Sequence, residues 1–125
     1  MTDADTPILA LRERVETFVQ RRDWEQFHNA KDLAAAIAIE AAELMELFLW
    51  QSPEEVAATT RQPDSAHRIK EELADVFILC CCLANRLEID ITSAVGDKVR
   101  QNEAKYPADR ARGKADKYTA YTQPE

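Results

Sequence analysis

The sequence contains little glycine, only two residues in 125. Tight turns between strands rely on glycine, so its scarcity argues against a sheet. Long runs rich in Ala, Leu, Glu and Lys favour helices instead. A chain of this length suffices for one domain and is too short for two. We therefore predict a single all-α domain over residues 1–125.

Long apolar runs are also missing. The longest, Val76 to Ala84, is far short of the roughly 20 residues that cross a bilayer. The start, Met1–Asp5, has no basic region followed by an apolar one, so we expect no secretory signal. The three cysteines, Cys80–Cys82, point about 100° apart on a helix and cannot converge on one metal. We interpret them as buried apolar residues in a reducing compartment, and expect a cytoplasmic protein without a membrane partner.

Basic residues are fewer than acidic ones: the chain has 16 Lys and Arg against 23 Asp and Glu, which gives a net charge of −7. Proteins that bind duplex nucleic acid neutralise its phosphates with clustered Lys and Arg, so a nucleic-acid duplex is not an expected partner. An acidic protein that handles phosphates needs a cation to mediate the contact.

Apolar periodicity and capping residues predict the helices. Asn29, Ser52 and Asp90 suit N-terminal caps, and Pro107 disfavours helix in the residue before it. The predicted helices cover about 7–22, 29–50, 53–60, 64–86 and 90–106. Residues 1–6 are expected to be flexible and 108–125 to form an extended tail.

Four main helices with short connections predict an antiparallel four-helix bundle. The helices at 29–50 and 64–86 are apolar around most of their circumference. They should therefore be central, and a second copy of the chain should cover them, which predicts a homo-oligomer.

Acidic residues recur at helical spacing within apolar surroundings. Glu40, Glu43 and Glu46 fan out along one side of a helix, and no Lys or Arg occurs between Lys31 and Arg61 to offset them. Glu72 and Asp75 share a face of the 64–86 helix. A single such pair is commonly a solvated face. Two pairs on apolar helices predict a metal site, because burying unpaired carboxylates costs several kcal/mol or more.

The ligand types indicate which metal is bound. An all-oxygen site suits Mg²⁺, with Mn²⁺ as a possible substitute. Di-iron bundles use Glu-x-x-His motifs, and neither histidine, His28 nor His67, completes one. Iron and zinc are therefore disfavoured.

Two further groups of residues suggest nucleotide contacts. Lys98, Asn102 and Lys105 lie on adjoining parts of one helical face and offer donors to phosphate oxygens, although such a face is often only solvated. Aromatic residues, which in connectors more often serve packing, flank the 29–50 helix and could stack on a nucleobase. They are Trp24, Phe27, His28 and Trp50.

Taken together and in order, these segments resemble the MazG-like superfamily of all-α nucleoside triphosphate pyrophosphohydrolases, over about residues 8–120. The motifs are Glu40-x-x-Glu43, Glu72-x-x-Asp75 and Lys98-x-x-x-Asn102-x-x-Lys105-Tyr106-Pro107. The segments Arg22–His28 and Ala111–Thr119 resemble the dCTP pyrophosphatase branch. Leu79 departs from that branch, which often has an aromatic residue there, so the preferred base stays open.

The resemblance implies a Mg²⁺ site formed by Glu40, Glu43, Glu72 and Asp75. It implies phosphate contacts from Lys98, Asn102, Lys105 and Tyr106, with Arg112 and Lys117 reaching a site from the tail. It also implies base contacts from Trp24 and Trp50 with His28 nearby, and a tetramer built from dimers.

The expected reaction is in-line attack of water on the α-phosphorus of a nucleoside triphosphate such as dCTP, with pyrophosphate leaving. Glu43 or Glu46 is the expected general base. One alternative keeps the enzyme class but changes the substrate to damaged or other pyrimidine deoxynucleoside triphosphates, or to a broad range of nucleotides. A second alternative is a non-catalytic helical oligomerisation module whose acidic helices bind a basic partner.

Overall fold

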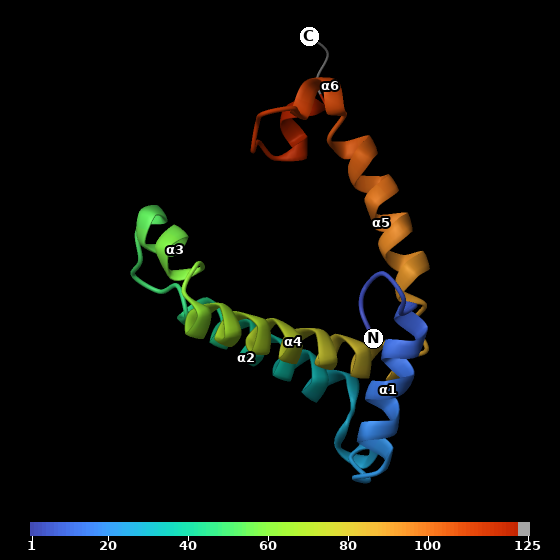
Figure 1. Cartoon of the computed structure of the whole chain (residues 1–125). Helices are drawn as coiled ribbons and strands as arrows, with labels where there is room; N and C mark the ends of the chain where they lie inside the picture. The colour runs from blue at the N-terminus through green and yellow to red at the C-terminus, as the bar shows by residue number, and fades with distance from the viewer. Residues whose placement is uncertain (123–125) are drawn as a thin grey trace. The chain divides into compact units, whose positions relative to one another are not determined.

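The computed structural model describes residues 1–122, and every regular element in that range is helical, which confirms the all-α prediction. The chain divides into two compact units, Met1–Ile89 and a second that begins at Asp90, and each is described by itself. No helix in the described range is long and apolar enough to cross a membrane. The first unit contains α1 (Ile8–Gln20), the 3₁₀ turn η1 (Glu25–Phe27), α2 (Ala30–Glu46), α3 (Pro53–Thr59) and α4 (Pro63–Arg86) (Figure 1).

The predicted capping residues begin three of the helices. The Asn29 side chain accepts a hydrogen bond from the Asp32 backbone N–H at 2.9 Å and so opens α2. Ser52 opens α3 in the same way. Asp90 caps α5 (Ile91–Lys105) by accepting from the Ser93 N–H at 2.8 Å. Each cap satisfies a backbone donor that the first helical turn leaves unpaired.

Helix α2 ends at Glu46, four residues before the predicted end at Trp50. The N–H groups of Leu47 and Phe48 bond to carbonyls three residues back, a tighter turn than the α-helix allows. Trp50 then adopts a positive φ of 65°, which reverses the chain ahead of α3. Apolar side chains continue through this segment, so periodicity alone extended the helix too far.

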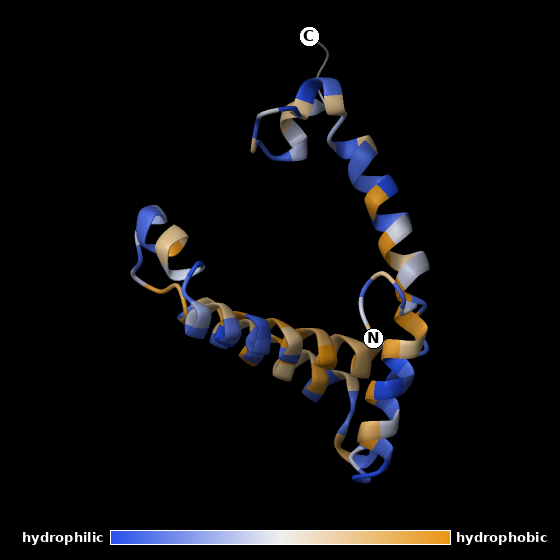
Figure 2. Ribbon diagram, viewed as in Figure 1, coloured by the Kyte–Doolittle hydropathy of each residue, from blue (hydrophilic) through white to orange (hydrophobic). Residues whose placement is uncertain are grey.

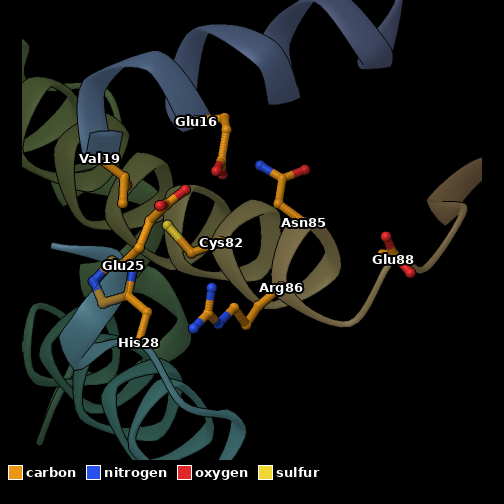
Figure 3. Close-up of a pocket in the computed structure, with 8 residues that line it drawn as sticks. All are labelled: Glu16, Val19, Glu25, His28, Cys82, Asn85, Arg86 and Glu88. Carbon is orange, nitrogen blue, oxygen red and sulfur yellow. The ribbon is translucent and has the colours of Figure 1, made fainter. Parts of the chain in front are cut away.

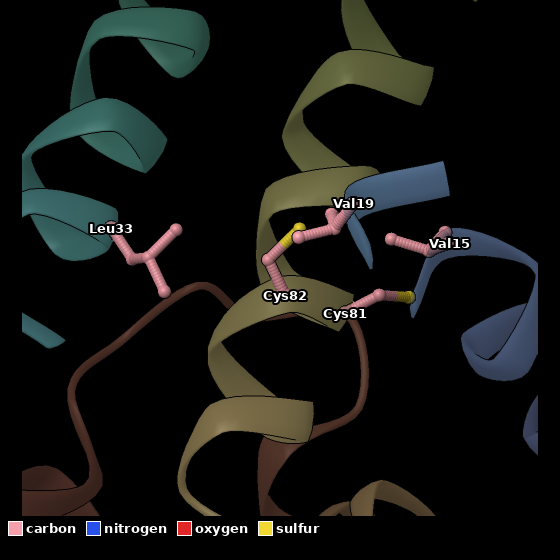
Figure 4. Close-up of a cluster of buried hydrophobic side chains, with 5 residues drawn as sticks. All are labelled: Val15, Val19, Leu33, Cys81 and Cys82. Carbon is pink, nitrogen blue, oxygen red and sulfur yellow. The ribbon is translucent and has the colours of Figure 1, made fainter. Parts of the chain in front are cut away.

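Within the first unit, α2 and α4 run antiparallel and side by side, and α1 packs against α4 (Figure 1). The buried core joins all three helices at the C-terminal end of α4 (Figure 4). Its residues are Val15, Val19, Leu33, Cys81 and Cys82. Cys81 and Cys82 are therefore buried as predicted, whereas Cys80 is half-buried, and all three are free thiols.

A polar contact supplements this core. The Arg12 Nε of α1 donates to the Asn85 side-chain oxygen at 2.9 Å, and the Asn85 amide donates back to the Arg12 carbonyl at 3.1 Å. The reciprocal pair ties α1 to the last turn of α4, because both partners must keep their relative position for both bonds to form.

The second unit corrects the prediction of an extended tail. After α5, the described residues up to Thr122 contain α6 (Ala108–Ala111) and the 3₁₀ turn η2 (Tyr118–Tyr121). The ring of Tyr106 contacts those of Tyr118 and Tyr121 edge-on, with centroids 6.4 and 5.9 Å apart. These contacts between distant aromatic residues fold the segment back, and helical periodicity does not reveal them. Residues 123–125 of the predicted tail lie outside the described range.

We predict that Leu33→Ala destabilises the protein by about 2–5 kcal/mol, because Leu33 is 2% exposed and its removal leaves a cavity between α2 and α4. Leu9→Ala removes the same atoms from a side chain that is 60% exposed, and should cost less than about 1 kcal/mol. Urea unfolding followed by circular dichroism measures both. Equal losses for the two variants would contradict the position of the core.

Candidate metal centre

Helices α2 and α4 bring three of the predicted carboxylates together. One carboxylate oxygen each from Glu40, Glu43 and Glu72 lies within 4.8 Å of the other two. Glu40 and Glu72 are half-buried and Glu43 is exposed. Glu40 and Glu43 are neighbours because they lie three residues apart on α2, whereas Glu72 reaches them only because α4 packs alongside. Packing therefore converts two sequence motifs into one acidic cluster.

Two oxygen atoms of this cluster have no hydrogen-bond partner. The Oε2 atoms of Glu40 and Glu72 are shielded from solvent and unpaired. The ion pairs within residues 1–122 lie elsewhere: Lys31 with Asp32, His67 with Glu71, and Arg100 with Asp97. Shielded carboxylate oxygens without a donor are costly, so the cluster needs a cation or a proton.

The electrostatics of the cluster lead to the same conclusion. A hydrogen bond with Glu43, followed by burial and by the negative charges of Glu43, Asp75 and Glu72, raises the pKa of Glu40 above its usual range. Burial and the charges of Glu43 and Asp75 raise the pKa of Glu72. Both shifts mean that burial and the neighbouring carboxylates oppose ionisation, and a divalent cation would favour it instead.

The donor set fits a hard divalent cation. Every ligand atom in the cluster is a carboxylate oxygen, and no histidine or cysteine belongs to it. Such a set suits Mg²⁺ or Mn²⁺ rather than zinc or iron. Asp75, which is exposed, lies outside the three-residue cluster but adds its negative charge to both Glu40 and Glu72. Glu46, the last residue of α2, is also exposed and outside the cluster.

The residues expected to contact the base do not line one common pocket within the first unit. Trp24 precedes η1 and packs edge-on against Phe18 at 5.6 Å between centroids, with the Arg22 guanidinium 3.9 Å above the Phe18 ring. Trp50 lies in the turn after α2 and is 92% exposed. Neither tryptophan lines the pocket that contains His28.

That pocket is polar and has a volume of about 220 Å³ (Figure 3). Besides His28, its lining includes Glu16 of α1, Glu25 of η1 and Arg86 of α4. The Gln20 side chain donates to both Glu16 and Glu25 at 3.2 Å. A hydrogen bond with Glu25, together with burial, raises the pKa of Glu16, and the same bond lowers the pKa of Glu25.

Sequence patterns did not reveal this carboxyl pair. Glu16 and Glu25 are separated by the chain reversal at Asp23, whose φ is +52°, and helical spacing does not extend across such a turn. The positive φ of Asp23 is not predictable from the residue alone, although aspartate adopts this conformation more often than most residues.

The residues expected to contact phosphate belong to the second unit. Lys98, Asn102 and Lys105 lie on α5, and Tyr106 follows its last residue. Lys105 Nζ lies 5.0 Å from the centroid of the Tyr118 ring, and the Tyr106 N–H donates to the Asn102 carbonyl at 2.8 Å. The last helical turn and the tyrosine contacts thus connect Asn102, Lys105 and Tyr106 locally.

We predict that Mg²⁺ raises the melting temperature of the wild-type protein on the order of 5 °C at saturation, because it binds the folded state. Glu72→Gln should remove that response while raising the melting temperature of the metal-free protein, since it relieves repulsion. Glu71→Gln is the matched control, because Glu71 is exposed and pairs with His67. Loss of the metal response in both variants, or in neither, would contradict the assignment of the centre.

Comparison with known proteins places the chain in a family. Residues 35–120 match the model of the MazG-like family. The chain is 42% identical to rat and 40% identical to human dCTP pyrophosphatase 1 over 102 residues, which are 82% of this chain and 60% of each relative. A pyrophosphatase from Archaeoglobus fulgidus superposes with a TM-score of 0.76 at 33% identity, covering 86% of this chain and 98% of that one. The protein belongs to the MazG-like family.

Proposed function

We propose that the protein is a divalent-metal-dependent nucleoside triphosphate pyrophosphohydrolase, converting a triphosphate and water into a monophosphate and pyrophosphate. The observation that carries the proposal is the cluster of Glu40, Glu43 and Glu72, with two shielded oxygens that lack a partner. The names of the relatives support the reaction class: two are dCTP pyrophosphatases and one is a pyrophosphatase. The chain spans 60% of the length of those curated relatives, so the activity is proposed from the site and the reaction class together.

In this mechanism Glu40, Glu43 and Glu72 would hold the ion, and Asp75 would add its negative charge beside them. A bound Mg²⁺ would offset the charge of the phosphates and lower the pKa of a water. Glu43 or Glu46 accepts the proton of the attacking water, since both are exposed and Glu46 is outside the three-residue cluster. No covalent enzyme intermediate is required, because water attacks the α-phosphorus directly while the bond to the leaving pyrophosphate breaks.

The phosphate chain is contacted by Lys98, Asn102, Lys105 and Tyr106, all of which are polar donors of the second unit. Trp24 and Trp50 stack on the base, and His28 lies near it. The exposed faces of both tryptophans support this role. We propose dCTP or a related pyrimidine deoxynucleotide as substrate, because the dCTP pyrophosphatases are the relatives named above.

We further propose a homo-oligomer, a dimer of dimers, in which the helices form an antiparallel four-helix bundle. Helices α2 and α4 carry large apolar side chains that stay exposed, and Figure 2 shows apolar residues along both. Ile39, Met45, Leu73 and Phe77 are between 43% and 60% exposed. Several large apolar side chains left exposed on two packed helices are typical of a surface that another chain covers. A cytoplasmic location agrees with the three free thiols.

Incubation with dCTP and Mg²⁺ should release dCMP and pyrophosphate as the first products, which anion-exchange chromatography and a pyrophosphate-specific assay identify. Glu43→Gln and Asp75→Asn should each lower kcat by about 10²-fold or more, since they remove charge from the centre. The control Glu54→Gln alters an exposed residue of α3 and should leave kcat within about twofold. Orthophosphate as the first product would contradict the proposed reaction.

A further inference from the structure

The turn η1 is flanked by two of the residues that the proposed function assigns to the base. Trp24 immediately precedes Glu25–Phe27, and His28 immediately follows it. None of the residues of η1 is buried, so apolar contacts hold this turn only weakly. Its position against α1 therefore depends largely on polar contacts, and the carboxyl pair of Glu16 and Glu25 supplies one of them.

The two carboxyl groups of this pair come from opposite sides of a chain reversal. Glu16 lies on α1 and Glu25 is the first residue of η1, and their side chains point toward one another in the pocket (Figure 3). The Gln20 amide nitrogen lies 3.2 Å from an oxygen of each. The two oxygens are therefore no farther apart than twice that distance. Two carboxylates this close repel each other when both are ionised.

A single shared proton removes this repulsion. Carboxyl groups can hydrogen-bond to each other only when one of them carries a proton, since an ionised carboxylate has no donor. The hydrogen bond with Glu25, followed by burial and the charge of Glu25, raises the pKa of Glu16. The same hydrogen bond, followed by that of Gln20, lowers the pKa of Glu25. Glu16 is thus the partner that keeps the proton, and Glu25 is the one that stays ionised.

Other charged or titratable side chains surround the pair without forming an ion pair with it. Arg86 of α4 and His28 line the same pocket, and the ion pairs found in residues 1–122 include neither of them. Their charges lower the pKa of Glu25. Burial raises the pKa of the Cys82 thiol to about 11, so the thiol stays uncharged near neutral pH. The remaining groups near Glu16 are Glu88 in this pocket, and Arg12 and Glu13 in the adjoining one.

We propose that Glu16 and Glu25 are positioning residues: together they form a proton-dependent switch that holds η1 on α1 and so positions Trp24 and His28 for base binding. The switch is closed while the pair shares one proton, and the Gln20 amide aligns both carboxyl groups. It opens as the pH rises and Glu16 loses its proton, because the two charges then push η1 away from α1. The raised pKa of Glu16 places this loss above the ordinary pKa of glutamate. The base contacts rest on the proposed function, whereas the switch itself does not.

Tryptophan fluorescence of the full chain, with EDTA present, tests the switch without metal or turnover. The background variant Trp50→Phe leaves Trp24 as the single tryptophan. On titration from mildly acidic to mildly alkaline pH, the emission maximum should shift to longer wavelength, because η1 loosens and Trp24 becomes more exposed than its present 42%. The midpoint of the shift should lie above the ordinary pKa of glutamate.

Variants of the pair should remove or move this shift. Glu16→Gln and Glu25→Gln each keep a hydrogen-bonding side chain but prevent a double negative charge, so the emission should stay in its low-pH form throughout. Gln20→Met should move the midpoint to higher pH, because the Gln20 amide favours the ionised forms of both carboxyl groups. Glu13→Gln is the matched control and should leave the midpoint unchanged, since Glu13 is exposed on the same helix and lies outside the pocket.

His28 requires a control of its own, because histidine is the side chain that ordinarily changes its charge near neutral pH. The fluorescence shift should persist in His28→Gln. The inference is overturned if the background variant shows no shift, if a folded glutamine variant of the pair keeps it, or if His28→Gln abolishes it. A lower midpoint in Gln20→Met would overturn it as well.

The consequence for the enzyme should appear in KM rather than in kcat. Above the transition, the wild-type KM for dCTP should exceed that of Glu16→Gln severalfold, whereas below it the two values should agree. The kcat values should keep the same pH dependence, because Glu16 does not belong to the metal cluster. A KM ratio that is constant with pH would overturn the positioning role. If the protein does not hydrolyse dCTP, the proposed function fails, while the fluorescence titration still decides whether the switch exists.

Discussion

Repulsion between carboxylates that two packed helices hold together is the constraint on which the candidate site of the first unit depends. Leu33 and Cys82 belong to the core at one end of the α2–α4 pair. Glu40 lies seven residues after Leu33 on α2, and Asp75 lies seven residues before Cys82 on α4. Seven residues span about 10 Å of helix, so the antiparallel register that buries the core also places the acids opposite one another. The apolar contacts thus determine where the negative charge gathers.

This arrangement is costly without a cation. Proximity and burial raise the pKa values of Glu40 and Glu72, which means that the fold disfavours their ionised forms. Carboxylates with perturbed pKa values are typical of functional sites. At such sites a bound cation offsets the electrostatic cost of bringing the carboxylates together. The buried core is small, and large apolar side chains of α2 and α4 stay exposed. The proposed oligomer would bury these side chains.

The sequence analysis succeeded where the controlling interactions are local. Asn29, Ser52 and Asp90 begin helices as predicted, because a cap depends on residues within one turn. It failed at a local chain reversal and at a contact between distant residues. Trp50 lies in a turn with a positive φ rather than on a helix, and Tyr121 folds back onto Tyr106 instead of belonging to an extended tail. Only at Tyr121 did tertiary contacts outweigh periodicity.

The residue pattern alone established the helical class and the acidic pairs of α2 and α4, since helical spacing and the lack of basic neighbours are properties of a linear chain. Only the packing of α2 against α4 showed that Glu72 lies beside Glu40 and Glu43. It also showed that Asp75 adds negative charge without belonging to the three-residue cluster. The carboxyl pair of Glu16 and Glu25 likewise forms only in the folded unit. Spacing along a helix orders neighbours within one element, whereas contacts between elements depend on how their side chains fit together.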